Sequence, residues 1–182
     1  MKSDYGLILA IVLILAFLSA GCISEDTPAP VVRSAAQPGV LIQTIGDVTG
    51  QGIILQGVPR GTIDTITFSV GLAPGLKTAD LNGTIIAYAD SVRTEILTPV
   101  EGYRGDPPPG YWGIIDSVNE MGSRNMRMDY EEQFVIRINP KAPVVPNQVI
   151  TISVKPKGGK ALMIRCIAPS AITETDNILP GL

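Results

Sequence analysis

Beyond Pro30 the apolar residues of this chain alternate with polar ones in short runs, and Gly, Pro, Asn and Asp separate these runs. Successive side chains of a strand point to opposite faces, so alternation is typical of a strand with one buried face. Ile66, Phe68 and Val70, for example, share one face of such a run. The pattern predicts strands over 40–48, 52–58, 62–72, 82–90, 132–138, 148–156 and 161–167.

These runs also predict the fold class. Roughly seven to nine short strands, with no convincing helix among them, indicate a mainly β domain over residues 39–182, an antiparallel β-sandwich of immunoglobulin-like type. Thr49-Gly50-Gln51 predicts a hairpin-like break between the first two strands, and Gly158-Gly159 predicts a positive-φ turn in the last hairpin. Cys166 lies on the apolar side of the last run, which predicts a small buried hydrophobe and not a nucleophile.

One segment, Thr98–Gly113, does not alternate. Its three consecutive prolines, Pro107–Pro109, remove backbone donors and favour an extended conformation. We therefore expect a surface loop or a crossover between sheets, from which Trp112 returns to the core; for Tyr111 both positions stay open. Arg104-Gly105-Asp106 spells an adhesion tripeptide, but three residues match by chance often, so we give it no functional weight.

The N-terminal residues 1–22 predict one hydrophobic helix, because Tyr5–Ser24 contains no charged side chain. Leu18–Cys22 resembles a lipobox, in which Cys22 would carry a lipid, and an uncleaved membrane helix and a simple secretion signal are the alternatives. Residues 23–38 are polar, acidic and proline-rich, as in a flexible linker. All three alternatives place the β domain outside the cytoplasm, anchored to the membrane in the first two.

The residue types argue against catalysis. The chain has no His to act as a base near neutral pH and no arrangement of nucleophile and base, so we expect neither an enzyme nor a cofactor. Oxygen ligands for Ca²⁺ could come from Asp116, Asn125 and Asp129, although their spacing is not that of an EF-hand and solvated charge is the alternative.

Charge and one further motif bear on partners and modification. Lys and Arg number 14 against 17 Asp and Glu, evenly spread, which argues against a nucleic-acid partner. Asn82-Gly83-Thr84 is an acceptor triplet for N-glycosylation, and an exported chain would meet the enzymes that use it.

From about Thr44 onward the chain resembles the outer domain of archaeal flagellins, the archaellins. The matching stretches are "GDVTGQG", "TIDTITFSVGLAPGLKTADLNGTIIAYAD", the Trp of "YWGI", "NMRMDYEEQFVIRI" and "PNQVITISVKPKGGKALMIRCIAP". The N-terminal stretch "AIVLILAF" is also similar to that family's, but it ends early, at Ser19–Cys22.

The resemblance implies a structural protein of the cell surface, a subunit or accessory component of the motility filament. Its partners would be other copies or archaellin subunits, the membrane through its N-terminus, and surface-layer protein. In a filament of this family the N-terminal helix would pack through its apolar residues, here Leu7, Ile11, Ile14 and Phe17. The alternatives are a lipid-anchored binding or adhesion lipoprotein and a stator-type accessory subunit with the same sandwich.

Overall fold

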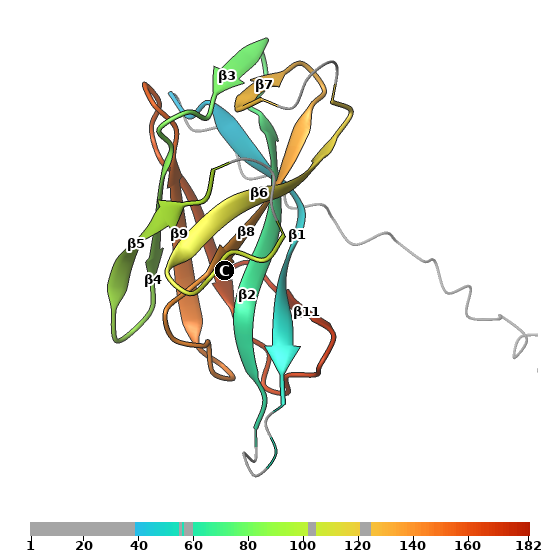
Figure 1. Cartoon of the computed structure of the whole chain (residues 1–182), viewed down its shortest axis with the longest axis vertical. Helices are drawn as coiled ribbons and strands as arrows, with labels where there is room; N and C mark the ends of the chain where they lie inside the picture. The colour runs from blue at the N-terminus through green and yellow to red at the C-terminus, as the bar shows by residue number, and fades with distance from the viewer. Residues whose placement is uncertain (1–38, 55, 57–59, 102–104, 121–124) are drawn as a thin grey trace, which may run out of the picture. The chain divides into compact units, whose positions relative to one another are not determined.

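A computed structural model of the chain describes residues 39–54, 56, 60–101, 105–120 and 125–182 (Figure 1). The predicted helix 1–22, with Leu7, Ile11, Ile14, Phe17 and Cys22, and the predicted linker 23–38 lie outside these residues. The described part contains eleven strands. They are β1 (Ile42–Ile53), β2 (Thr62–Leu72), β3 (Thr78–Asp80), β4 (Ile85–Ala89), β5 (Thr94–Pro99), β6 (Tyr111–Val118), β7 (Arg127–Asp129), β8 (Gln133–Asn139), β9 (Val149–Lys155), β10 (Leu162–Ile167) and β11 (Asp176–Leu179).

Nine of these strands pair in the order β10-β9-β4-β5-β6-β8-β2-β1-β11, and β3 pairs with β7. The long sheet folds over into two layers, β10-β9-β4-β5 and β6-β8-β2-β1-β11 (Figure 1). The layers connect where β5 and β6 pair in parallel, through Thr98 with Tyr111 and Pro99 with Trp112; the other strand pairs are antiparallel. The predicted β-sandwich is therefore confirmed.

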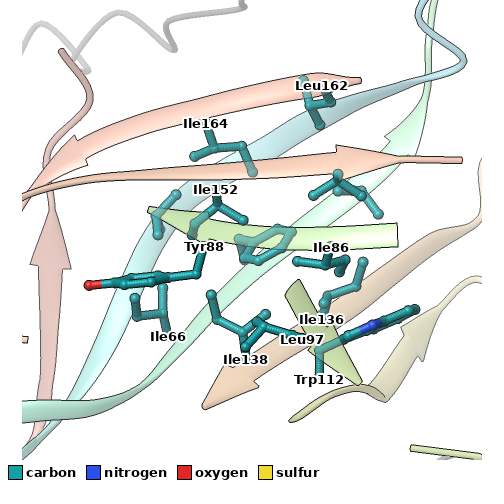
Figure 2. Packing of buried hydrophobic residues seen from close by; sticks show 14 of the residues in the cluster. Ile66, Ile86, Tyr88, Leu97, Trp112, Ile136, Ile138, Ile152, Leu162 and Ile164 are labelled. Carbon is teal, nitrogen blue, oxygen red and sulfur yellow. The ribbon is translucent and has the colours of Figure 1, made fainter. Parts of the chain in front are cut away.

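The core lies between the two layers, as Figure 2 shows for its labelled residues. Ile86, Tyr88 and Ile152 face it from one layer, and Ile66 and Ile136 face it from the other, and all five are fully buried. Burying one such side chain stabilises the fold by about 1.5–3 kcal/mol. The alternating positions that predicted the strands are thus the positions that hold the layers together.

The hairpin predicted at Thr49–Gln51 is wrong, because β1 continues without a turn through Ile53. Its pairing with β2 shifts register between Ile45 and Thr49 and again between Gln51 and Gly52. The glycines allow close packing here: a Cβ on Gly50 would lie 2.7 Å from Ile63 Cγ2, and one on Gly52 would lie 1.8 Å from the carbonyl oxygen of Thr173. Gly52 and Ile53, the start of the second predicted strand 52–58, are therefore the end of β1; Leu55, Gly57 and Val58 of that predicted strand lie outside the described residues.

Several smaller predictions are confirmed. Gly158 has φ +79° in the turn between β9 and β10. Trp112 is buried, whereas Tyr111 keeps 38% of its surface exposed. Cys166 is fully buried, and this burial raises the pKa of its thiol to about 12, so the nucleophilic thiolate is not populated near neutral pH.

Within the described residues there is no helix with the length and apolar character to span a bilayer.

Candidate assembly surface

The layer β10-β9-β4-β5 turns its second face to solvent, and that face includes three exposed large apolar side chains, Ile85, Ile96 and Met163. Cross-strand pairing puts Met163, Ser153, Ala87 and Ile96 in one row across the four strands. Neighbouring strands are about 4.8 Å apart, so the row is about 15 Å long. Met163 is 53% exposed and Ile96 is 71% exposed.

A second row lies next to the first on the same face. It contains Ile85, which is two residues before Ala87 on β4, and Lys155, which pairs with Ile85. Ile85 is 51% exposed. We name Ile85, Ala87, Ile96 and Met163, with the small Ser153 between them, the outer patch. Neighbouring exposed apolar side chains on one surface are typical of a contact site for another molecule, whereas single ones carry no such meaning.

The charged residues in the rows that contain or border the outer patch are cations. On its other side the next row contains Arg165, Thr151, Ala89 and Thr94. Within these three described rows the charged residues are Lys155 and Arg165, both cations. The patch therefore suits an apolar partner surface bordered by carboxylates.

On the second layer polar side chains of β2 and β8 face outward, and the proline segment lies against them. Arg137 of β8 donates from Nε to Thr67 Oγ1 at 2.9 Å and forms an ion pair with Asp106. Asn139 Nδ2 donates to the carbonyl oxygen of Pro107 at 2.8 Å. Asp106, the last residue of the adhesion-like tripeptide, is thus engaged within the chain, and Arg104 lies outside the described residues.

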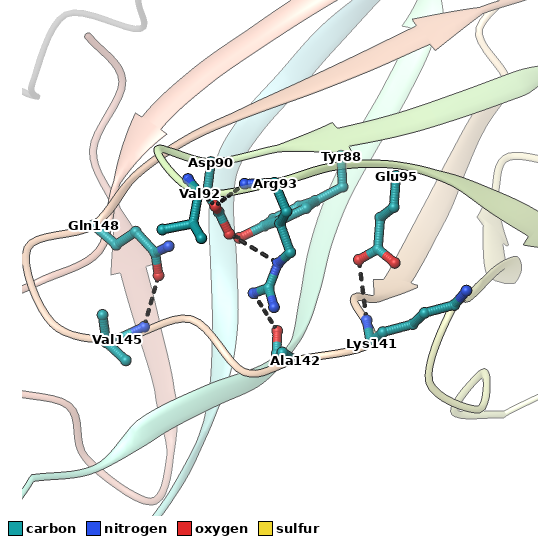
Figure 3. Close-up of polar contacts among 9 residues, drawn as sticks. All are labelled: Tyr88, Asp90, Val92, Arg93, Glu95, Lys141, Ala142, Val145 and Gln148. Atoms are coloured by element: carbon teal, nitrogen blue, oxygen red, sulfur yellow. Dashed lines mark hydrogen bonds and ion pairs between the residues drawn. The ribbon is translucent and has the colours of Figure 1, made fainter.

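A polar network fixes the β4–β5 hairpin and with it the position of Ile96 (Figure 3). The Asp90 carboxylate accepts hydrogen bonds from the backbone N–H groups of Val92, at 2.8 Å, and Arg93, at 3.0 Å. It also accepts one from the Tyr88 hydroxyl at 3.0 Å and lies 3.0 Å from Arg93 Nε. Arg93 Nη2 in turn donates to the carbonyl oxygen of Ala142 at 2.8 Å, which joins the hairpin to the β8–β9 connection.

The same network shifts two pKa values. Burial raises the pKa of Asp90, but the hydrogen bonds from Val92, Arg93 and Tyr88 and the charge of Arg93 outweigh it, so the net pKa is lowered. Burial, together with the neighbouring Asp90 charge, raises the pKa of Tyr88. The group therefore holds an ionised carboxylate beside a neutral phenol and a guanidinium, an arrangement that stabilises the hairpin.

The three calcium candidates all have local partners. Asp116 Oδ1 accepts from the Ser117 N–H at 2.9 Å, and Asn125 Oδ1 accepts from the Arg127 N–H at 2.6 Å. The carboxylate of Asp129 lies 3.3 Å from Arg127 Nε. No cluster of three or more His, Cys, Asp or Glu side chains suited to a metal occurs in the described part of the chain. The calcium site stays a sequence prediction that this geometry does not strengthen.

Asn82, the glycosylation candidate, lies exposed in a tight turn between β3 and β4. Its N–H donates to Asp80 Oδ1 at 2.8 Å, and the Thr84 N–H donates to the carbonyl oxygen of Leu81 at 3.1 Å. Gly83 has φ +67°, a conformation in which glycine has no steric cost. The turn presents the Asn82 side chain to solvent, as an acceptor site requires.

Comparison with known proteins gives structural neighbours only. No protein-family model matches the sequence, and no curated protein matches it. Archaeal flagellin FlaB1 from Methanocaldococcus jannaschii is similar with TM-score 0.56 and 15% identity, over 76% of this chain and 95% of that one. The archaeal flagellum of Methanospirillum hungatei strain JF1 is similar with TM-score 0.51 and 12% identity, over 78% of this chain and 72% of that one.

Both solved structures are archaeal flagellins or flagella, and neither is an enzyme. The resemblance to archaellins that the sequence motifs predicted is confirmed in three dimensions. The described β-sandwich has the fold of an archaeal flagellin.

Proposed function

We propose that this protein is an archaellin-like structural protein of the cell surface, a subunit or accessory component of the archaeal flagellum. It acts by assembly and not by catalysis. The observation that carries the proposal is the shared fold, which extends over 95% of the flagellin FlaB1 chain. The outer patch supports it, because a protein that assembles needs a surface for its neighbours.

The N-terminus would hold the domain at the cell surface. In this proposal residues 1–22 insert into the membrane, or pack among neighbouring subunits, through Leu7, Ile11, Ile14 and Phe17. Residues 23–38 then serve as the spacer. Ile11→Asp should abolish membrane or filament association and leave the β domain folded, because a carboxylate is costly in a bilayer or an apolar bundle. Normal localisation of this variant in fractionated cells would contradict the proposal.

The charge of the outer patch suggests how copies meet. The whole chain has a net charge of −3, while the rows around the patch contain only cations among their charged residues. Two such patches facing each other would bring like charges together. Contact between the patch and a different, acidic surface of the next subunit is therefore favoured, and such a heterologous contact can continue into a filament. The neighbour is another copy of this chain or an archaellin subunit.

Ile96→Lys tests the patch. Ile96 is 71% exposed, so the change should leave stability within about 0.5 kcal/mol. Loss of its burial in the contact, at about 1–1.5 kcal/mol, should weaken association about tenfold. Val92→Lys is the matched control, because it adds the same charge to the same hairpin at a residue that is 88% exposed and lies outside the patch.

Electron microscopy of surface filaments, with sedimentation of the purified full chain, would measure the effect. We expect the protein concentration needed for assembly to rise about tenfold in Ile96→Lys and to stay unchanged in Val92→Lys. Equal assembly of both variants would contradict a role for the patch.

A second candidate function is a lipid-anchored binding or adhesion lipoprotein, or a stator-type accessory subunit, with the same sandwich. The lipobox-like Leu18–Cys22 favours it, because a lipid on Cys22 would replace the apolar helix. Cys22→Ser should then release the protein into the medium, whereas its retention would favour an uncleaved helix. The mass of the mature N-terminus separates the two directly. Surface-layer protein is the partner that we would test first by co-purification.

A further inference from the structure

In the acceptor triplet Asn82-Gly83-Thr84 the first two residues are exposed and the third is buried. Asn82 is exposed, but Thr84 retains only 4% of its surface. The Thr84 hydroxyl oxygen, Oγ1, is buried and has no hydrogen-bond partner among the described residues. The folded domain therefore hides the side chain that distinguishes an acceptor triplet from any other asparagine.

A buried hydroxyl without a partner is unfavourable for folding, because the group gives up its hydrogen bonds to water and gains none in return. Valine has nearly the same shape and would avoid this loss at a site beside the apolar strand β4. The hydroxyl of Thr84 thus has no use in the folded state that the structure reveals. We therefore look for a role of this hydroxyl in the unfolded chain, where it is accessible.

The turn itself adds a second obstacle to modification after folding. It is held by the Thr84 N–H to Leu81 carbonyl bond, at 3.1 Å, and by the Asn82 N–H to Asp80 Oδ1 bond, at 2.8 Å. An enzyme that reads Asn82 and the Thr84 hydroxyl together would have to break the turn and pull the start of β4 out of the sheet. The unfolded chain presents both side chains without this cost.

We propose that Asn82 is a glycosylation site whose glycan is transferred before the β-sandwich folds, with the Thr84 hydroxyl recognised on the unfolded chain and buried afterwards. The bond forms between Asn82 Nδ2 and the anomeric carbon of a lipid-linked oligosaccharide. The bond from that carbon to the lipid phosphate breaks, the phosphate leaves with the electron pair, and the proton lost from Nδ2 goes to solvent. This proposal does not depend on assembly, and its test reads glycan occupancy and not filament formation.

The test compares the same acceptor in two states. Membranes of the source cells, with their own lipid-linked donor, are incubated with non-glycosylated full-length protein, folded, and with a synthetic peptide covering residues 78–90. We expect the peptide to be modified at least about tenfold faster, because the folded chain presents the triplet only when it opens. Equal rates would overturn the proposed order, and an unmodified peptide, or an unmodified Asn82 in the native protein, would overturn the site.

Two variants in the source cells separate recognition from stability. Thr84→Val should remove the glycan from Asn82 and, compared as non-glycosylated proteins, raise the Tm of the domain by about 2–4 °C. Gly83→Ala keeps the acceptor triplet and strains the turn, since φ is +67° while no atom lies within 4 Å of the added Cβ. Its glycan occupancy should equal that of the wild type. A loss of occupancy in Gly83→Ala would indicate that the enzyme reads the folded turn, and a lower Tm in Thr84→Val would show that the hydroxyl stabilises the fold.

Discussion

Asp90→Asn removes the charge of the residue at the centre of the β4–β5 network and replaces one of its acceptor oxygens with an amide donor, with little change of shape. The asparagine oxygen can still accept from the N–H groups of Val92 and Arg93, so the turn keeps its backbone bonds. The new amide group, however, faces the Nε of Arg93, which lies 3.0 Å from the Asp90 carboxylate. A donor then meets a donor, and the ion pair is lost.

The magnitude follows from the burial of the two partners. The side chain of Asp90 is 0% exposed and that of Arg93 is 30% exposed, so water can replace part of what the guanidinium loses. The hydrogen bond from the Tyr88 hydroxyl to the charged Asp90 carboxylate contributes about 1.5–3 kcal/mol, and the part-exposed ion pair with Arg93 adds at most about 1 kcal/mol, so we expect a loss near 2 kcal/mol. Urea denaturation should show a midpoint lower by about 1 M. Asp47→Asn, at an exposed aspartate, is the control and should change stability by less than about 0.5 kcal/mol.

The stability difference between wild type and Asp90→Asn should also depend on pH. The folded pKa of Asp90 is lowered from its ordinary value of 3.8, so its contribution is fully present above that value and is lost as the pH falls through the folded pKa. The difference between wild type and Asp90→Asn should be constant from pH 7 to pH 5 and should shrink below about pH 3.8. A stability loss under about 0.5 kcal/mol at pH 7, or a difference at pH 2 as large as that at pH 7, would refute the assigned role.

Two further predictions concern packing and thiol chemistry. Gly52→Ala should destabilise the domain by about 2 kcal/mol or more, because the new Cβ would lie 1.8 Å from the Thr173 carbonyl oxygen and that backbone must move. Gly105→Ala is the control and should be neutral, because no atom lies within 4 Å of its added Cβ. Thermal denaturation measures both variants. Equal melting temperatures of the two variants would argue against close packing of β1 on the 172–175 segment. Cys166 should resist iodoacetamide at pH 8 in the native protein and react in denaturant, since it is fully buried and its pKa is raised to about 12. Peptide mass mapping distinguishes labelling of Cys166 from labelling of Cys22. Rapid labelling of Cys166 in the native protein would contradict its burial.

The alternation of side chains predicted β2, β4, β8, β9 and β10 because their inward positions are consistently apolar. It predicted the first part of β1 over 40–48 but ended that strand too early, because Gly50 and Gly52 serve close packing against Ile63 and Thr173 and not a turn. Local sequence cannot distinguish these two uses of glycine. It also missed β5 and β6, because their pairing through Thr98 and Tyr111 depends on the whole sandwich closing.

The outer patch could not be read from the sequence either. Ile85 and Ile86 are adjacent, so one of them has to face outward, and only the cross-strand register puts Ile85 on the face that also contains Ala87, Ile96 and Met163. Asn82 was found from its triplet alone, whereas the burial of Thr84 needed the three-dimensional structure.

Site-specific cross-linking in living cells tests assembly through the outer patch most directly. A photo-reactive amino acid at Ile96 of the full chain, illuminated in cells, would attach to whatever molecule covers the patch, and mass spectrometry would identify the attached peptide. The same residue at Val92, which is outside the patch, provides the background. We expect a cross-link from position 96 to another copy of this chain or to an archaellin subunit. Cross-links no stronger than those from position 92 would contradict the account.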